Sequence, residues 1–135
     1  MILIVDDTPI TARWVGYVAQ HLGFNAVLAS NAEEALNCLA DGQFVTVISD
    51  IEMPGMSGFE LLQNIRLRYP DMPVILMSAF WDRERHEAAR TFGAQGTLQK
   101  PVNADQLTEL FGGGPQTIQS NAPEQFAPAL SVDAA

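Results

Sequence analysis

Five short apolar runs alternate along this chain of 135 residues with segments whose apolar positions recur at helical spacing. The runs are almost continuously apolar, which is typical of buried parallel strands covered on both faces. Strands are predicted at residues 2–5, 25–29, 44–49, 73–77 and 95–99. Helices are predicted near residues 9–22, 32–41, 58–69, 82–92 and 103–111. This alternation predicts an α/β fold, a single doubly wound (βα)5 domain with helices on both faces of a parallel sheet.

Local signals support the predicted helices. Ser30–Glu33 and Ser57–Glu60 both match the capping box, in which a hydroxyl and a carboxylate satisfy the first free amides of a helix. Ile10 and Trp14 stand at helical spacing in the first helix, so we expect Trp14 in the core. The many charges of residues 82–92 are expected to form mainly a solvated face.

The composition is acidic. Sixteen Asp and Glu residues against seven Lys and Arg residues give a net charge of −9, which disfavours binding to nucleic-acid backbones. The single cysteine, Cys38, excludes an internal disulfide, and we expect it reduced and buried. No apolar run approaches the roughly 20 residues that span a membrane, and no basic leader precedes the first strand. We therefore expect a cytoplasmic protein without membrane contact.

Residues 112–135 differ in composition from the rest of the chain. Gly112–Pro115 ends the last predicted helix, and the following residues are rich in Gln, Ala, Pro and Ser without sustained periodicity. We expect one folded domain at residues 1–111 and a flexible C-terminal tail at residues 112–135. A disordered end or the start of a linker is the favoured interpretation, and a segment that docks a partner is the alternative.

Polar residues with chemical potential follow four of the five predicted strands. Asp6 and Asp7 follow the first strand, whereas Asp50, Ser78 and Lys100 follow the third, fourth and fifth. The carboxyl ends of parallel strands share one edge of the sheet, where doubly wound domains bind their ligands. We therefore expect these five side chains to lie together.

This combination suits phosphoryl chemistry. Three carboxylates at one edge repel one another, and a hard divalent cation with oxygen ligands is the simplest compensation, so Mg²⁺ is the expected cofactor and Mn²⁺ the alternative. The Lys100 ammonium and the Ser78 hydroxyl suit the oxygens of a tetrahedral anion. Aspartate is a recognised nucleophile for phosphoryl transfer, which makes Asp50 the candidate acceptor.

The same motifs, in this order, resemble the receiver domains of two-component response regulators, and in particular the chemotaxis-type (CheY-like) receivers. The resemblance rests on Asp6–Asp7, on Asp50 with the turn Met53–Gly58, on Ser78–Ala79 and on Lys100–Pro101. It covers residues 1–111. It implies a flavodoxin-like fold with strand order 2-1-3-4-5, a cis Lys100–Pro101 peptide bond, and a phosphorelay signalling domain that is not an enzyme acting on another substrate.

The resemblance also implies roles for individual residues. Asp50 would accept a phosphoryl group from a sensor histidine kinase or a phosphotransfer protein. Ser78 would bond a phosphoryl oxygen and move on activation, and Lys100 would pair with the phosphoryl group. The implied metal ligands are Asp6, largely through water, Asp7, Asp50 and the main-chain carbonyl of Glu52.

Three positions bear on how such a switch would work. The position three before the lysine is usually aromatic in the family and is Thr97 here, which leaves the Ser78 movement without its usual aromatic partner. Glu52 and Phe80 occupy positions that tune dephosphorylation. The resemblance implies that phosphorylation changes the affinity for a protein partner on the surface of residues 82–111, without direct contact to nucleic acid.

Two other functions stay open. A scaffold that docks a partner without phosphorylation is the alternative that Thr97 favours. A metal-dependent phosphatase with an aspartyl intermediate also uses carboxylates and a lysine. Such enzymes carry an Asp-x-Asp arrangement after the first strand, whereas Asp6 and Asp7 are adjacent here, which disfavours this class.

Overall fold

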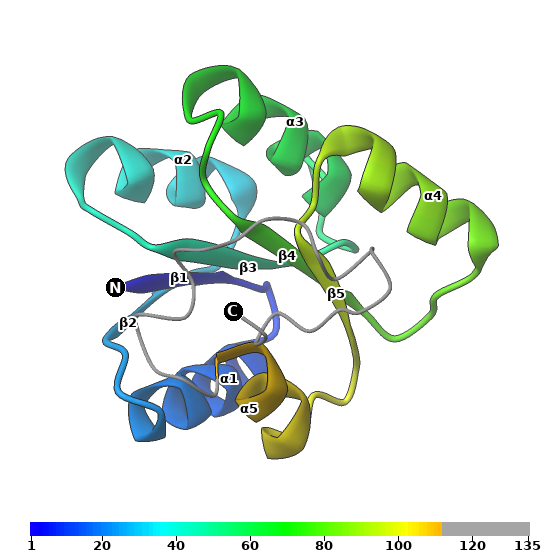
Figure 1. The fold of residues 1–135 in the computed structure, drawn as a ribbon. Helices are drawn as coiled ribbons and strands as arrows, with labels where there is room; N and C mark the ends of the chain where they lie inside the picture. Colours follow the sequence, from blue (N-terminus) through cyan, green and yellow to red (C-terminus); the bar gives the residue numbers. More distant parts are fainter. Residues whose placement is uncertain (112–135) are drawn as a thin grey trace.

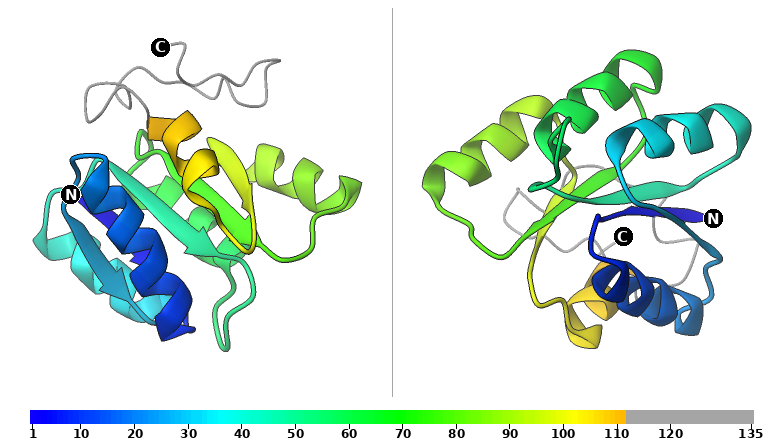
Figure 2. Two further views of the ribbon diagram at one scale, coloured as in Figure 1. Left: turned by 90° about the horizontal axis from the view of Figure 1, so that it is seen from below. Right: turned by 180° about the vertical axis from the view of Figure 1, so that it is seen from behind.

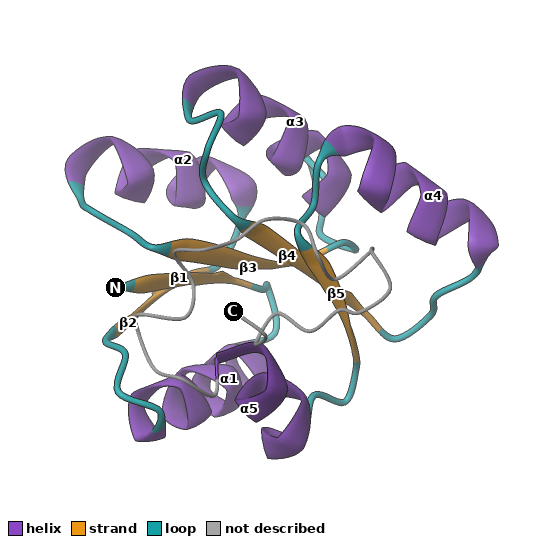
Figure 3. Ribbon diagram, viewed as in Figure 1, coloured by secondary structure: helices purple, strands orange, loops and turns teal. Residues whose placement is uncertain are grey.

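The computed structural model describes residues 1–111, and the predicted tail at residues 112–135 lies outside the described residues. Strands and helices alternate throughout the described part (Figures 1 and 3). The strands are β1 (Ile2–Val5), β2 (Ala26–Ala29), β3 (Thr46–Asp50), β4 (Val74–Ser78) and β5 (Gly96–Gln99). The helices are α1 (Pro9–His21), α2 (Ala32–Asp41), α3 (Gly58–Arg68), α4 (Arg83–Phe92) and α5 (Ala104–Phe111). None of these helices is long and apolar enough to cross a membrane.

The five strands form one parallel sheet in the order β2-β1-β3-β4-β5. Helices α1 and α5 cover one face, and α2, α3 and α4 cover the other (Figures 1 and 2). The predicted doubly wound fold and strand order are therefore confirmed. The chain runs from β1 to β2 on one side and then to β3 on the other side of β1. This reversal places the topological switch point at the carboxyl ends of β1 and β3.

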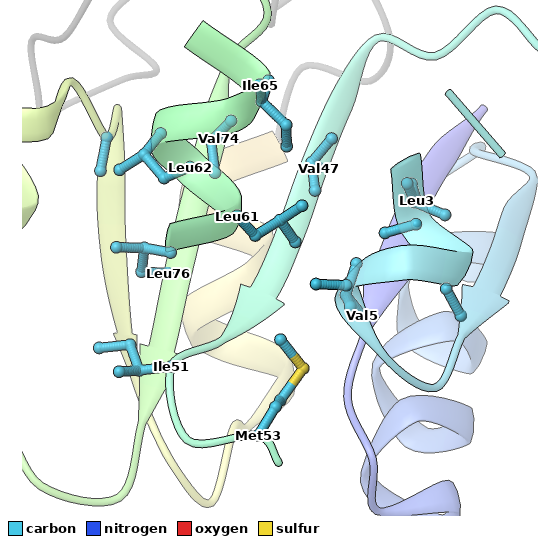
Figure 4. Close-up of a cluster of buried hydrophobic side chains, with 14 of the residues drawn as sticks. Leu3, Val5, Val47, Ile51, Met53, Leu61, Leu62, Ile65, Val74 and Leu76 are labelled. Carbon is cyan, nitrogen blue, oxygen red and sulfur yellow. The ribbon is translucent and has the colours of Figure 1, made fainter. Parts of the chain in front are cut away.

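Two apolar clusters hold the helices on the sheet. Successive strand residues point to opposite faces. In β1, Ile4 joins the cluster beneath α1 and α5, while Leu3 and Val5 join the cluster beneath α2 and α3. Figure 4 shows the second cluster, with Leu61 of α3 beside Val47 of β3. Because the central strands are buried on both faces, their sequences are continuously apolar.

The buried face of α1 differs from the predicted one. Ile10 is 76% exposed and Trp14 is 42% exposed, so the prediction that Trp14 belongs to the core was wrong. Mostly small side chains face the sheet instead, namely Ala12, Val15, Val18 and Ala19. Space is tight on this side, because a Cβ at Gly16 would lie 3.4 Å from Leu28 Cδ2. The large apolar residues of α1 therefore lie on its outer side.

The two predicted capping boxes had different outcomes. Ser57–Glu60 forms both bonds of the box at the start of α3, as predicted. At α2 the predicted box Ser30–Glu33 was wrong by one residue. The Asn31 side chain accepts a hydrogen bond from the Glu34 amide at 2.8 Å, and the Glu34 carboxylate accepts one from the Ser30 amide at 2.8 Å. The side-chain oxygen of Asn31 thus caps α2 in place of the Ser30 hydroxyl.

Three smaller expectations can be compared directly. Strand β2 begins one residue later than predicted and β3 two residues later, which is the usual uncertainty of element ends. Cys38 is a free thiol that is only half-buried against the α2–α3 cluster, so the prediction of a buried thiol was wrong. The Lys100–Pro101 peptide bond is cis, as expected.

Leu61 and Leu67 provide a matched test of the packing of α3. Leu61 is fully buried and Leu67 is 82% exposed. We expect Leu61→Ala to lower the free energy of unfolding by about 2–5 kcal/mol, because it leaves a cavity beneath the helix. Leu67→Ala should change it by less than about 0.5 kcal/mol. Urea unfolding followed by circular dichroism measures both, and equal losses would contradict the described packing.

Candidate functional site

The polar residues predicted at the strand ends lie at one edge of the sheet. Asp6 follows β1, Asp50 ends β3, Ser78 ends β4 and Lys100 follows β5. These strands are neighbours in the sheet, and their parallel register aligns their ends, with Asp50 opposite Met77. The expected meeting of these residues is therefore present in the structure.

Asp6, Asp7 and Asp50 form an acidic cluster in which one carboxylate oxygen of each lies within 4.8 Å of the others. Asp6 and Asp50 are buried, and Asp7 is exposed. Asp6 Oδ1 accepts a hydrogen bond from the Thr8 amide at 2.9 Å, whereas the buried Asp6 Oδ2 accepts none from the described residues. This oxygen is therefore compensated only by an ion pair with Lys100 among the described residues, and the oxygen donor set of the three carboxylates fits a hard divalent cation.

The ammonium of Lys100 bridges the two buried carboxylates. Its Nζ lies 3.0 Å from Asp50 Oδ2, to which it donates a hydrogen bond, and 3.0 Å from Asp6 Oδ2, in an ion pair without hydrogen-bond geometry. Burial alone would lower the pKa of Lys100, but the hydrogen bond to Asp50 and the charges of both carboxylates outweigh it and raise the pKa. Lys100 therefore stays charged at neutral pH.

The surroundings of Asp50 disfavour the negative charge of its carboxylate. Burial is the main cause that raises the pKa of Asp50 to about 6, and the nearby charge of Asp6 acts in the same direction. Hydrogen bonds from Lys100 and from the Glu52 amide, at 3.3 Å from Asp50 Oδ1, oppose this rise without cancelling it. A bound cation would relieve the remaining cost of the negative charge.

The hydroxyl of Ser78 has every hydrogen-bonding position occupied. Its Oγ accepts hydrogen bonds from the Phe80 amide at 3.0 Å and from Arg85 Nη1 at 2.9 Å. Its single proton lies between Glu52 Oε2 at 2.9 Å and the Phe80 carbonyl at 3.0 Å. A hydroxyl has one donor and two acceptor positions, so Ser78 must release a partner before it bonds another group.

Arg85 belongs to this site, and the sequence analysis missed it. Its guanidinium forms an ion pair with Glu52, and its Cζ lies 5.5 Å from the centroid of the Phe80 ring, which is itself 59% exposed. Burial would raise the pKa of Glu52, but hydrogen bonds from Arg85 and Ser78 outweigh it and lower the pKa. No sequence signal separates Arg85 from Arg83, because both begin the same charged helix.

Thr97 lies half-buried in the middle of β5, where the family usually has an aromatic side chain. Two tryptophans from other elements form hydrogen bonds to the backbone at the end of β5 and just after it. Trp81, in the loop after β4, donates its Nε1–H to the Leu98 carbonyl at 2.8 Å, and Trp14 of α1 donates its Nε1–H to the Val102 carbonyl at 2.7 Å. Two indoles from opposite faces of the sheet thus hold the backbone on either side of the lysine at the strand end.

Gly58 sets the approach of α3 to the strand end. A Cβ at this position would lie 2.2 Å from the carbonyl oxygen of Asp50 and 2.8 Å from Ile51 Cα. The Gly58 amide instead donates a hydrogen bond to the Ile51 carbonyl at 2.9 Å. Only glycine allows this contact between the start of α3 and the end of β3, which explains the glycine in the Met53–Gly58 turn.

Comparison with known proteins agrees with this geometry. The family model of the response regulator receiver domain matches residues 2–111. The chain belongs to the response regulator receiver domain family. Response regulator protein FleR of Pseudomonas aeruginosa is 46% identical over 109 residues, which cover 81% of this chain and 23% of FleR. Sensor histidine kinase RcsC of Escherichia coli is 35% identical over 111 residues, which cover 82% of this chain and 12% of RcsC.

Solved receivers share the fold of this receiver domain. Chemotaxis protein CheY4 of Vibrio cholerae superimposes with a TM-score of 0.76 at 30% identity, covering 78% of this chain and 90% of the CheY4 chain. The resemblance inferred from the strand-end motifs is therefore confirmed. The chain spans less than a quarter of the length of FleR and of RcsC, at 23% and 12%. The roles of individual site residues stay predictions.

The raised pKa of Asp50 predicts a pH-dependent stability in the absence of divalent cations. A carboxyl whose folded pKa lies near 6 and whose unfolded pKa lies near 3.8 binds protons more tightly in the folded state. Stability therefore falls as the pH rises through this window. Asp50→Asn should exceed the wild type by on the order of 1–3 kcal/mol above pH 7, and by little at pH 4.

Urea unfolding in the presence of a chelator, from pH 4 to pH 8, measures this difference. Asp41→Asn is the matched control, because Asp41 is exposed at the end of α2. A gain for Asp50→Asn that does not depend on pH would contradict the raised pKa.

Proposed function

We propose that this receiver domain accepts a phosphoryl group on Asp50 from a phosphohistidine of a sensor kinase or a phosphotransfer protein. The phosphorylated form then has a changed affinity for a protein partner. The position of Asp50, 3.0 Å from the Lys100 ammonium and inside the acidic cluster, is the observation that supports this proposal most strongly. A buried carboxylate beside a fixed cation is placed to act as a nucleophile toward an anionic group.

The proposed transfer follows from the groups around Asp50. A carboxylate oxygen forms the new bond to phosphorus while the phosphorus–nitrogen bond breaks, and the electron pair stays on the leaving imidazole nitrogen, which takes up a proton from solvent. Lys100 neutralises charge on the transferred group, and the Ser78 hydroxyl donates a hydrogen bond to one phosphoryl oxygen. Such a reaction needs mainly positioning and charge neutralisation, which fixed charges at a buried strand end provide.

The acidic cluster is the proposed magnesium site. Its ligands would be Asp6, Asp7, Asp50 and the main-chain carbonyl of Glu52, with Mn²⁺ as an alternative ion. When bound, the ion supplies neutralisation of the phosphoryl oxygens. The charges favour it, because within residues 1–111 the three clustered carboxylates and Glu52 pair with two cations, Lys100 and Arg85. One divalent ion would balance the two excess negative charges.

The proposed output follows from the change of charge. An acyl phosphate adds about one negative charge and new acceptor oxygens beside Ser78 and Lys100. The surface of residues 82–111 is the proposed contact with a downstream protein. In this role the domain changes its own phosphorylation state and does not act on another substrate. A cytoplasmic location and the lack of direct contact to nucleic acid stay predictions, as does the flexible tail at residues 112–135.

A scaffold that works without phosphorylation is the second candidate function. The observation in its favour is Thr97, because a half-buried threonine cannot take the part of the family's aromatic residue. The two candidates differ in whether Asp50 is modified, so one experiment separates them.

Acetyl phosphate provides that experiment. Incubation with Mg²⁺ and acetyl phosphate should add one phosphoryl group, detected by intact mass as an adduct that survives acid and is lost in base. The adduct should be absent in Asp50→Asn and without Mg²⁺, and present in Asp41→Asn. An unmodified wild type would favour the scaffold, and a stable adduct on Asp50→Asn would contradict the assignment of the acceptor.

Magnesium binding can be tested separately. Mg²⁺ should raise the thermal midpoint of the wild type, since a ligand at 100 times its Kd stabilises the folded state by about 2.7 kcal/mol. Asp7→Asn should reduce the shift, because Asp7 is the exposed ligand of the cluster and its loss disturbs no buried contact. Calorimetry with and without a chelator measures the shift, and an undiminished shift in Asp7→Asn would place the ion elsewhere.

A further inference from the structure

One side chain connects the start of α4 to the proposed phosphorylation site. Arg85 lies in the first turn of α4, where the side chain of the N-cap residue, Asp82, accepts a hydrogen bond from the Arg85 amide at 2.8 Å. The cap fixes the first turn, and this turn directs Arg85 back toward the strand ends. The Arg85 side chain is 30% exposed, so it is partly withdrawn from solvent although its helix is highly charged.

The hydrogen bonds of the Arg85 guanidinium to the site come from one nitrogen. Nη1 lies within hydrogen-bond distance of Glu52 Oε2, of Ser78 Oγ at 2.9 Å and of the Phe80 carbonyl at 2.9 Å, so these three acceptors share its two hydrogens. These acceptors belong to the loop after β3, to the end of β4 and to the loop after β4. Arg85 therefore joins α4 to the loop that follows Asp50 at the end of β3 and to the end of the neighbouring strand β4.

This polar link matters because α4 has little apolar anchoring. Ala89 is the only buried residue of α4, and the N-terminal half of the helix contributes none. At this end the helix is held by the stacking of His86 on Trp81, with ring centroids 4.7 Å apart, and by the polar bonds of Arg85, so the loss of a polar bond is felt there. The usual aromatic link is also missing, since position 97 is a threonine.

We propose that Arg85 is the positioning residue that couples α4 to the phosphorylation state of Asp50. This inference rests on the proposed function. In the resting form, Arg85 and Glu52 together hold the Ser78 hydroxyl. A phosphoryl group on Asp50 offers a new acceptor for the single proton of Ser78, and the hydroxyl then leaves Glu52 and Arg85.

The exchange is energetically accessible because the Arg85–Glu52 pair is partly solvated, with side chains 30% and 48% exposed. Partly solvated ion pairs contribute little to the free energy of folding. Hydrogen bonds to charged phosphoryl oxygens are stronger than those between neutral groups. Losing the Ser78 contact removes one of the three acceptors around Nη1 and loosens the first turn of α4. The helix thereby responds without an aromatic side chain.

Hydrogen exchange of peptides covering residues 83–92 tests this coupling, with and without acetyl phosphate and Mg²⁺. In the wild type, phosphorylation should speed exchange in the first turns of α4 several-fold. In Arg85→Gln, exchange should already be this fast in the unmodified protein and should change little on phosphorylation. Arg83→Gln is the matched control and should behave as the wild type, because Arg83 is exposed and, within residues 1–111, its ion pair is with Glu87 at 3.8 Å on the same helix.

Two further variants separate positioning from mere structural support. Arg85→Lys should keep most of the response, because an ammonium carries three hydrogens on one nitrogen and all three contacts come from one nitrogen. Ser78→Ala should form the adduct more slowly, because a phosphoryl oxygen loses its hydroxyl donor, and its phosphorylated form should show no α4 response, because the coupling hydroxyl is gone. Ser78→Ala keeps the test decisive if Arg85→Gln does not fold.

Intact mass on the same samples distinguishes the two proposals. No adduct on the wild type overturns the proposed function. An adduct together with a normal α4 response in Arg85→Gln or in Ser78→Ala overturns the role of Arg85 and leaves Asp50 as acceptor. If the wild type forms the adduct but hydrogen exchange in α4 does not change, the proposed role of Arg85 is overturned as well.

Discussion

One ammonium shared between two buried carboxylates underlies the rest of this site. Parallel strands end at one edge, and the order of this sheet brings Asp6 and Asp50 there together. Burying a charge costs several kcal/mol unless it is paired, and Lys100 pairs with both at 3.0 Å. One positive charge cannot satisfy two negative ones. The fold therefore keeps an excess of negative charge, which adds to the effect of burial in raising the pKa of Asp50 and explains the fit to a divalent ion.

The α3 side and the α4 side of the site differ in how far they can move. On the side of α3, Gly58 approaches the Asp50 carbonyl so closely that no Cβ fits, and the start of the helix is tied to β3 by the Gly58 amide. On the side of α4, polar contacts through Ser78 and Arg85 replace tight packing. A packed contact has one arrangement, whereas hydrogen bonds can be exchanged. Any rearrangement caused by new charge at Asp50 should therefore run toward α4.

The fold and the strand-end residues could be predicted from sequence because their signals are abrupt. Continuous apolar runs that stop at Asp6 and at Asp50 mark both the strands and the edge where they end. Arg85 could not be predicted, since its partners come from other elements and its own helix is charged throughout. Trp14 was misplaced because apolar spacing alone does not reveal that only small side chains fit between α1 and the sheet. The missed and wrong predictions concern residues whose positions depend on contacts with other elements of the fold.

The two tryptophans have a practical consequence. The sequence contains only Trp14 and Trp81, and their indole N–H groups bond to the carbonyls of Val102 and Leu98, on either side of Lys100. Indole emission depends on the polarity and hydrogen bonding around the ring. Ultraviolet fluorescence of the unlabelled protein therefore reports on the backbone that carries the lysine, from both faces of the sheet at once.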